Sequence, residues 1–563
     1  MNNNHKGTKF ENFVFDILDK PLKSLLVMVL IFASLAGAIM MFPSKIVMAK
    51  MLPGKSTNTF TIYVDTPKGS SISQTRAVTQ CVTDIMGKEE AVTDLEIFLG
   101  EGSPLDYAGL VKGSGMKHGE EFAEVVVNLT DKHEREEKSF KMVQRLRPII
   151  QNSCQPIVAE TNIKMIEMPA GPPTLASIVV EVYGKDNQKV IQLSGEVANV
   201  LKNTDGLVDV DVMADETYKK YVLTPISDKI AKSGLSVKQV NQILYLAFEG
   251  MGVAVKNTIE LNDQISIFVS LSEKSQTLSL NKLDVLKNKL SQLSLMNKKG
   301  MMVPLPEVVT IEEGVSTPMI YHKDLKTMVN VVAETDMVSQ VYPLLDAREM
   351  MIEKFSDKYE VTKVAGITTY MFDLNLKDKA TGEKYLLRWD GEMKVTLDTF
   401  RDLGGAFIAA LILIFLLLVI YYKSFALSGI VLGGSFLSII GVIVGHFVAD
   451  LVTTETFFLT ATSLIGFIAL MGISSRNSLL LIDFAQSLIK DKGIEKRRAI
   501  AIASATRAKP IMLTAIAIIL GSALLASDPV FGGLGVALIS GTVAAVIVSL
   551  IFIPILLNKT KAI

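Results

Sequence analysis

Long apolar stretches flank a large polar region in this chain. The first covers residues 22–42, and five more follow at about 404–422, 426–448, 459–486, 510–526 and 533–557. An α-helix needs about 20 mostly apolar residues to cross the hydrocarbon core of a bilayer. The pattern therefore predicts one membrane helix, a polar domain over residues 43–402, and five more membrane helices.

The distribution of lysine and arginine gives these predicted helices an orientation. The loop 487–509 carries seven basic residues, and the tail carries Lys559 and Lys561. The loops near residues 450–455 and 528 carry no basic residue. Because cytoplasmic loops are enriched in Lys and Arg, the chain ends and the basic loop are expected in the cytoplasm. Residues 43–402 are then expected on the other side of the membrane.

Strand-like and helix-like patterns alternate within the polar region. The first set predicts strands at 59–65, 91–99, 122–129 and 157–168, with helices at 71–86 and 139–153. This order is typical of a split β-α-β unit of ferredoxin-like type. A second set follows, with strands at 177–183, 208–212, 327–333 and 359–365 and a helix at 190–202.

A segment with its own elements interrupts the second set. It has helical patterns at 226–232 and 237–248 and a strand pattern at 264–271, which predicts an inserted subdomain. Residues 366–384 are polar and poorly periodic, and we expect a loop there.

Composition supports a mixed membrane and soluble architecture. The chain has 57 basic and 58 acidic residues among 563, and its mean hydropathy is +0.37. The two cysteines, Cys81 and Cys154, provide neither a disulfide framework nor a zinc ligand set, and we expect small buried thiols in helices. The sequence has no Walker A motif and no persuasive catalytic constellation. No enzymatic activity, cofactor or metal site is therefore predicted.

One ionisable side chain lies deep within an apolar stretch. Arg476 is about ten residues from the expected cytoplasmic boundary near Gln486, or about 15 Å along a helix. A cation at that depth costs about 3 kcal/mol on insertion scales, which makes it a functional candidate. An arginine that only reaches the headgroups is the alternative. His446, in another apolar stretch, is interpreted as a hydrogen-bonded or lumen-facing histidine.

Four motifs resemble the C-terminal half of a resistance-nodulation-division (RND) efflux permease, over residues 22–557. Two are weak by themselves, namely Pro67-Lys68-Gly69-Ser70-Ser71 and the proline-rich 169–173. Two are specific, namely Gly472–Asn477 with Leu480–Ala485, and Arg507-Ala508-Lys509-Pro510-Ile511-Met512-Leu513-Thr514. The resemblance implies an α-helical membrane protein with an α+β extracytoplasmic domain. It also implies six transmembrane helices (1 + 5) and two ferredoxin-like porter subdomains with an inserted docking subdomain.

The resemblance also divides the chain. The expected parts are a cytoplasmic leader (1–21), transmembrane helix 1 (22–42), porter subdomain 1 (43–170), porter subdomain 2 (171–213 and, with a connector, 301–402), the docking subdomain (214–300), transmembrane helices 2–6 (403–557, with basic loop 487–509) and a cytoplasmic tail (558–563). It implies a trimer in the bacterial inner membrane, working with a periplasmic adaptor and an outer-membrane channel.

The motif residues suggest a proton relay made of Arg476, Asn477, Asp483, Arg507 and Thr514. Drug-exporting relatives usually have lysine at the position of Arg476, and an arginine would be a fixed charge because it does not deprotonate. Simpler roles exist for the others: Asp483 can pair with cations such as Lys490, Arg507 can anchor its helix, and Thr514 can bond its own backbone. Asn477 can hydrogen-bond a neighbouring helix.

The family's proton-carrying aspartate pair belongs to the other half of such permeases, and this sequence has no Asp-Asp pair. The leading hypothesis is therefore a subunit of a proton-driven exporter of small amphiphilic molecules, completed by an N-terminal-half subunit. One alternative is a half-size homomeric relative of the protein-translocation accessory type. The other is a membrane scaffold that transports nothing.

Overall fold

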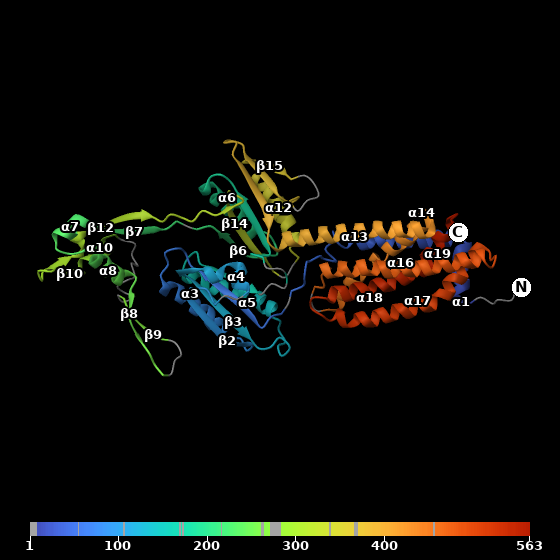
Figure 1. The fold of residues 1–563 in the computed structure, drawn as a ribbon, viewed down its shortest axis with the longest axis horizontal. Helices are drawn as coiled ribbons and strands as arrows, with labels where there is room; N and C mark the ends of the chain where they lie inside the picture. The colour runs from blue at the N-terminus through green and yellow to red at the C-terminus, as the bar shows by residue number, and fades with distance from the viewer. Residues whose placement is uncertain are drawn as a thin grey trace.

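The computed structural model describes residues 8–54, 56–104, 107–167, 171, 174–215, 217–259, 264–270, 283–336, 339–364, 370–453 and 456–562. The molecule is elongated (Figure 1). A bundle of long helices forms one end, two sheets with their helices lie in the middle, and a smaller lobe forms the other end. All but Gly171 of the proline-rich motif 169–173 lies outside the described residues.

The first sheet has the strand order β2-β3-β1-β4 and is antiparallel. Its elements are β1 (Thr59–Asp65), α3 (Ile72–Met86), β2 (Val92–Glu101), α4 (Tyr107–Lys112), β3 (His118–Leu129), α5 (Ser139–Cys154) and β4 (Asn162–Glu167). The inward-facing residues of the strands pack on α3 and α5 in one apolar core. The predicted elements are confirmed, except that β4 begins at Asn162 and a 3₁₀ turn covers Gln155–Ile157.

The second sheet has seven strands. Its elements are β5 (Ile178–Tyr183), α6 (Asn187–Lys202), β6 (Leu207–Met213), β13 (His322–Lys323), β14 (Lys326–Thr335), α12 (Val341–Phe355), β15 (Tyr359–Lys363), β16 (Leu374–Asp378) and β17 (Lys384–Asp390). The loop predicted at 366–384 is wrong where it is described, because β16 lies inside it. Only Leu374 and Leu376 of β16 are buried, and two alternating positions are too few to identify a strand.

The lobe at the far end is built by the segment between β6 and β13. It contains β7 (Lys219–Pro225), α7 (Ser227–Lys232), α8 (Val237–Phe248), β8 (Met251–Lys256), β9 (Ile265–Val269), α10 (Leu283–Ser291), β10 (Ser294–Met296), β11 (Met302–Pro304), α11 (Leu305–Val308) and β12 (Val309–Val315). A two-stranded ribbon of β7 and β12 leads to it. Its core joins Ile230 and Val240 to Leu305 and Val308, so residues on both sides of position 300 pack together.

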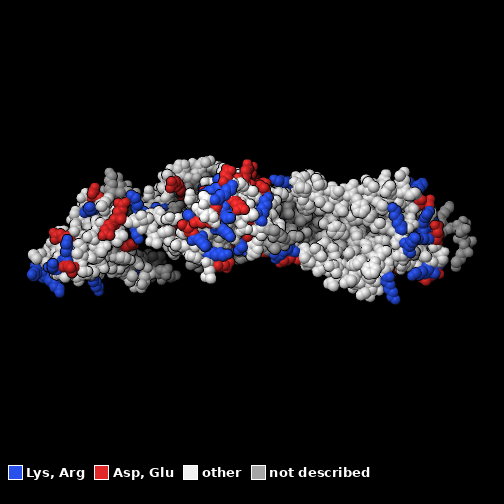
Figure 2. Space-filling model, turned by 90° about the horizontal axis from the view of Figure 1, so that it is seen from above, with Lys and Arg blue, Asp and Glu red and all other residues white. Residues whose placement is uncertain are grey.

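Six helices of the described chain are long and apolar enough to cross a membrane. They are α2 (Pro21–Met40), α13 (Glu392–Tyr422), α14 (Phe425–Phe436) continued by α15 (Ile439–Val452), α16 (Ala461–Lys490), α17 (Lys496–Ala526), and α18 (Gly532–Ile547) continued by a π-helical turn (Val548–Phe552) and α19 (Ile553–Lys559). On the face in Figure 2, charged residues cover the sheets and the outer end of the bundle, with an uncharged band between them.

Four helices differ from the predictions. α13 begins at Glu392, inside the second sheet's core, where Met393 is fully buried. α16 and α17 extend so far that only residues 491–495 separate them, so the predicted basic loop 487–509 is mostly helical. The predicted leader contains a helix, α1 (Lys9–Asp19), which buries Val14, Ile17 and Leu18.

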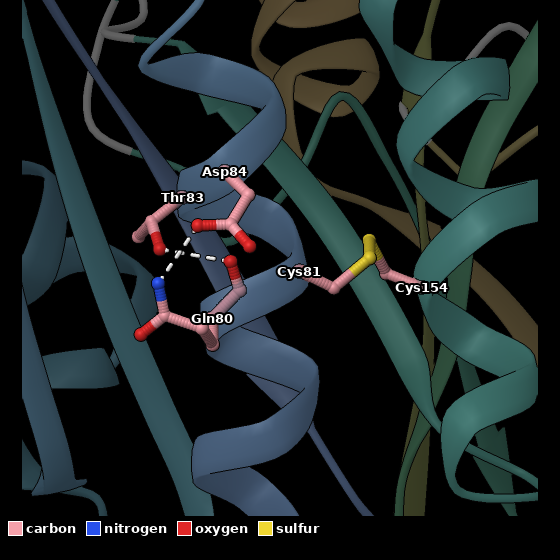
Figure 3. Close-up of a disulfide and its surroundings, with 5 residues drawn as sticks. All are labelled: Gln80, Cys81, Thr83, Asp84 and Cys154. Atoms are coloured by element: carbon pink, nitrogen blue, oxygen red, sulfur yellow. Dashed lines mark hydrogen bonds between the residues drawn. A yellow bond between two sulfur atoms is a disulfide. The ribbon is translucent and has the colours of Figure 1, made fainter.

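The two cysteines form a disulfide, which corrects the prediction of free thiols. Cys81 of α3 and Cys154 of α5 have Cα atoms 5.7 Å apart (Figure 3). The bond joins two helices that cover the same sheet. Helical patterns placed both residues correctly, but they do not show that the two helices lie side by side.

Candidate proton-relay site

α16 packs against α14, α17 and α18 in the bundle. Its first turn is closed by Thr460, whose hydroxyl accepts a hydrogen bond from the backbone N–H of Ser463 at 3.3 Å. Small residues allow α18 to approach closely, since a Cβ on Gly541 would lie 2.2 Å from Leu470. Close backbone approach is the usual basis of helix packing in membranes. One face of α16 is thereby buried.

Arg476 lies on the opposite face. It is exposed, in a stripe with Ile465, Ala469, Gly472 and Leu480, whose spacing of three and four residues defines one side of a helix. Arg476 is near the middle of α16, about 20 Å from either end. No ion pair or side-chain hydrogen bond joins Arg476 to another described residue. In this six-helix bundle, a cation therefore projects from an otherwise uncharged stripe.

Asn477 is buried on the inner face of the same turn, at 4 % exposure. The hydroxyl of Ser474, one turn earlier, is buried and makes no hydrogen bond to a described residue. The side chains of Arg476 and Asn477 thus lie on different sides of α16, although the two residues are adjacent in the motif.

Asp483 accepts hydrogen bonds from two tyrosines of α13. The Tyr422 hydroxyl lies 3.0 Å from Oδ1, and the Tyr421 hydroxyl lies 3.1 Å from Oδ2. No ion pair to Lys490 occurs among the described residues, so the simple pairing suggested for Asp483 is corrected. The two tyrosines were missed. They end an apolar stretch, where interfacial aromatics are common, but nothing in the sequence pairs them with Asp483.

Arg507 of α17 packs against α16. Its guanidinium carbon is 5.0 Å from the ring centroid of Phe484, which places a cation on an aromatic face. Its Nε is buried and makes no hydrogen bond to a described residue. Arg507 thus lies beside the residue that follows Asp483.

Thr514 lies two turns along α17 from Arg507 and is exposed. Its hydroxyl donates to backbone carbonyls of its own helix, Ile511 at 2.9 Å and Pro510 at 3.2 Å. Thr514 therefore bonds the backbone of its own helix, which is the simpler role that the sequence allowed.

The five residues do not converge within this chain. Contacts bring only Arg507 close to the α16 segment that carries Asp483, whereas Arg476 and Thr514 are exposed. His446 is a separate buried group, bonded at Nδ1 to the Val442 carbonyl and at Nε2 to Ser463, both at 2.8 Å. The prediction of a hydrogen-bonded histidine is confirmed.

The chain matches one family model, and it spans about half the length or less of the known proteins that it resembles. The model describes the AcrB/AcrD/AcrF family and matches residues 4–358 and 371–560. The multidrug export protein AcrF of Escherichia coli (strain K12) is 21 % identical over 562 residues, covering 98 % of this chain and 49 % of AcrF. The swarming motility protein SwrC of Bacillus subtilis (strain 168) is 26 % identical over 385 residues, covering 66 % of this chain and 32 % of SwrC.

Solved structures show the same fold. Two crystal forms of a heavy metal efflux pump align with TM-scores of 0.69 and 0.67, at 17 % and 18 % identity. They cover 98 % and 97 % of this chain and 51 % of the pump in each case. The chain thus spans about half the length of the pump.

Proposed function

Because this chain belongs to the AcrB/AcrD/AcrF family of RND efflux permeases, we propose that it acts as the C-terminal half of a proton-driven exporter. A partner half would supply the carboxylates that carry protons. The family consists of transporters, and the apolar helices together with the family indicate a multi-pass protein of the inner membrane. The proposed cargo is small and amphiphilic.

One observation carries this proposal, namely that Arg476, on the exposed side of α16, has no ion-pair partner within the described part of the chain. A cation facing hydrocarbon is costly, and a covering helix with an ionisable carboxylate would remove that cost. Arg476 would in turn stabilise the ionised form of that carboxylate, and protonation would release the attraction. Thr514, also exposed, and Arg507 would line the path of protons from the cytoplasmic end, while Asn477 and Asp483 would hold α16 to its neighbours.

Affinity purification tests the proposal. A tagged form of this chain is expected to retain a second membrane subunit with about six spans and intramembrane carboxylates. A second copy of this chain cannot supply an Asp-Asp pair. A homo-oligomer that transports without any other subunit would contradict the proposal and favour the half-size homomeric alternative. A chain that assembles but never supports transport would favour the scaffold.

We predict that residues 43–402 are extracytoplasmic. The disulfide supports this orientation, because disulfides persist in oxidising compartments. Single cysteines introduced at the exposed positions Lys185 and Lys492 would be free thiols in a chain whose two native cysteines are bonded to each other. An impermeant maleimide added to intact cells, with the outer membrane made permeable, should label Lys185→Cys and not Lys492→Cys. Labelling of both, or of Lys492→Cys alone, would refute the topology.

We also predict that the hairpin of β8 and β9 grips a neighbouring protomer in the proposed trimer. Every described residue of β9 is exposed, including Ile267 at 47 % and Phe268 at 60 %. Such apolar exposure is typical of an interaction surface. Ile267→Ser with Phe268→Ser should leave expression unchanged but dissociate the oligomer in native mass measurements. Lys256→Ser, in the partner strand, is the control. Unchanged oligomers in the double variant would exclude this role for the hairpin.

A further inference from the structure

A cluster of charged side chains with little exposure lies where the two sheets meet the bundle, at the N-terminal end of α13: Lys50 is buried, and the three carboxylates of the cluster are half-buried. It consists of Lys50, Glu167 at the end of β4, Glu334 in β14 and Glu392 at the start of α13. We refer to these four residues as the buried junction. The Lys50 ammonium interacts electrostatically with all three carboxylates, yet no ion pair joins it to a described carboxylate within 4.0 Å. Burial lowers the pKa of Lys50, and the three carboxylates oppose that effect.

Glu167 is the least satisfied member of the buried junction. Its Oε1 is buried and has no hydrogen-bond partner among the described residues. Burial raises its pKa from an ordinary 4.5 to about 7, with a further increase from Glu334, while Ser139, Arg147 and Lys50 oppose the change. Glu334 differs, because Lys112 and the Ser177 hydroxyl hold its pKa below the usual value despite burial. Only one of these two carboxylates is thus poised to change charge near neutral pH.

A buried amide lies beside the junction. Gln340, which precedes α12, is fully buried, and its side chain interacts with the Glu392 carboxylate. Neither Nε2 nor Oε1 makes a hydrogen bond of ordinary geometry to a described residue, so this contact is a weak one.

The junction is tied to α16 through the strand-like segment that contains Lys50. Ala49 bridges Leu459 in parallel, and the Lys50 N–H donates to the Leu459 carbonyl at 3.1 Å. Leu459 precedes Thr460, which caps α16. Ser339, next to Gln340, donates through its hydroxyl to the Ala49 carbonyl. The segment thus connects the start of the Arg476 helix to the second sheet.

The junction is tied to α13 through Glu334. Its carboxylate accepts hydrogen bonds from the Ser177 N–H at 3.1 Å and hydroxyl at 2.5 Å, and it pairs with Lys112 of α4. The first N–H of α13, that of Glu392, donates to the Ala176 carbonyl at 3.0 Å. Gly391 makes this approach possible, since a Cβ there would lie 2.6 Å from the same oxygen.

We propose that the buried junction is a proton-binding site outside the membrane, in which protonation of Glu167 changes the contacts that tie α13 and α16 to the two sheets. A proton from solvent would bond to a Glu167 carboxylate oxygen and remove its negative charge. The groups that face this site are Lys50, Lys112, Arg147, Glu334 and Glu392, and removal of one carboxylate charge weakens the field that holds Lys50 in place. The inference goes beyond the proposed function, because the site can bind a proton whether or not the chain exports anything.

The sign of the pH effect follows from the raised pKa of Glu167. The folded protein holds this proton more tightly than the unfolded chain does. The stabilising contribution of Glu167 is therefore complete below about pH 4.5 and is lost as the pH rises through about 7. Changes in the junction should occur in that upper range, where exposed carboxylates are already ionised.

Infrared difference spectroscopy of the purified full chain tests the proposal. Between about pH 6 and pH 8, on either side of the pKa of about 7, the wild-type protein should lose one carboxylic-acid band. Glu167→Gln should lack this change, and Glu136→Gln, which alters an exposed carboxylate, should retain it. Lys50→Met should move the midpoint to higher pH because a cation is removed, whereas Lys50→Arg should not.

Hydrogen exchange tests whether the proton site is coupled to α13 and α16. A coupled change is pH-dependent and confined to the first turns of these two helices, whereas unfolding would raise exchange throughout the protein. Backbone amides at 392–396 and 459–463 should change their exchange rates between about pH 6 and pH 8 in the wild type, after correction for intrinsic rates, and not in Glu167→Gln. A wild-type spectrum with no titrating carboxyl, or the same band in Glu167→Gln, would overturn the proton site. If Glu167→Gln does not fold, an unshifted midpoint in Lys50→Met would overturn it. Equal exchange at both pH values would overturn the coupling to α13 and α16.

Discussion

Arg476→Met is expected to abolish proton-coupled export while leaving expression and assembly intact. The substitution removes the cation but keeps a long side chain that suits hydrocarbon. An opposite charge close by lowers a carboxylate pKa by about 1 to 3 units, and each unit corresponds to a factor of ten. Loss of the cation should therefore change the protonation equilibrium of the carboxylate at a given pH on the order of 10- to 1,000-fold, which is enough to stop coupled export. Arg476→Lys should retain measurable activity, since the positive charge remains.

The assay is substrate efflux driven by an imposed pH gradient, in vesicles that contain this chain and the proposed partner half. Arg497→Met is a matched control, because Arg497 pairs with the exposed Asp19 at the end of the bundle, and exposed ion pairs contribute little. Wild-type rates from Arg476→Met would refute the relay role and favour an arginine that only anchors or packs. Purified assembly is checked in parallel, so that a loss of protein is not mistaken for a loss of transport.

Removal of the disulfide is expected to lower the stability of the first sheet by about 4 kcal/mol. The bond links residues separated by 73 positions, and closing a loop of that length restricts the unfolded chain by about this amount in the chain-entropy description. Cys81→Ser with Cys154→Ser should accordingly increase hydrogen exchange in α3 and α5. Treatment of the wild-type protein with a reductant should have the same effect.

Two comparisons make this prediction specific. Ser153→Ala, at the exposed neighbour of Cys154, should leave exchange in α3 and α5 unchanged. The chain's one tryptophan, Trp389, lies in β17 of the second sheet. Its fluorescence therefore reports unfolding of the second sheet, whose midpoint should change little when the disulfide is removed. Equal exchange in the reduced and oxidised forms would show that the bond stabilises nothing.

Regular patterns made much of this fold predictable. β1 alternates Phe60, Ile62 and Val64 with more polar residues, and the apolar stretches are about as long as a bilayer span requires. β16 was missed because its buried residues, Leu374 and Leu376, form too short a pattern. α13 was predicted too short because its first turn is buried in a soluble core by Met393 and Thr396, whereas the prediction relied on hydropathy alone.

The candidate site was less predictable than the fold. Motif spacing found Arg476 and Asp483, but contacts between distant segments decide what these residues do. Tyr421 and Tyr422 reach Asp483 only because α13 packs beside α16. The pairing of Cys81 with Cys154 likewise depends on two helices sharing one sheet face. The sequence indicates a partner that would cover Arg476 in only one way, by a charged residue on the otherwise uncharged exposed stripe of α16.

The continuity of α13 has a consequence for how the two ends of the molecule influence each other. It is one helix of 31 residues, about 46 Å long, with its first turn in the second sheet and its last turn against Asp483. Energetic coupling between two binding sites is reciprocal. If proton binding in the bundle of the proposed exporter alters cargo affinity tenfold, cargo must alter proton affinity tenfold, about 1.4 kcal/mol in each direction. Saturating cargo should therefore shift the acid–base titration of the bundle in an equilibrium measurement, with no pH gradient and no turnover.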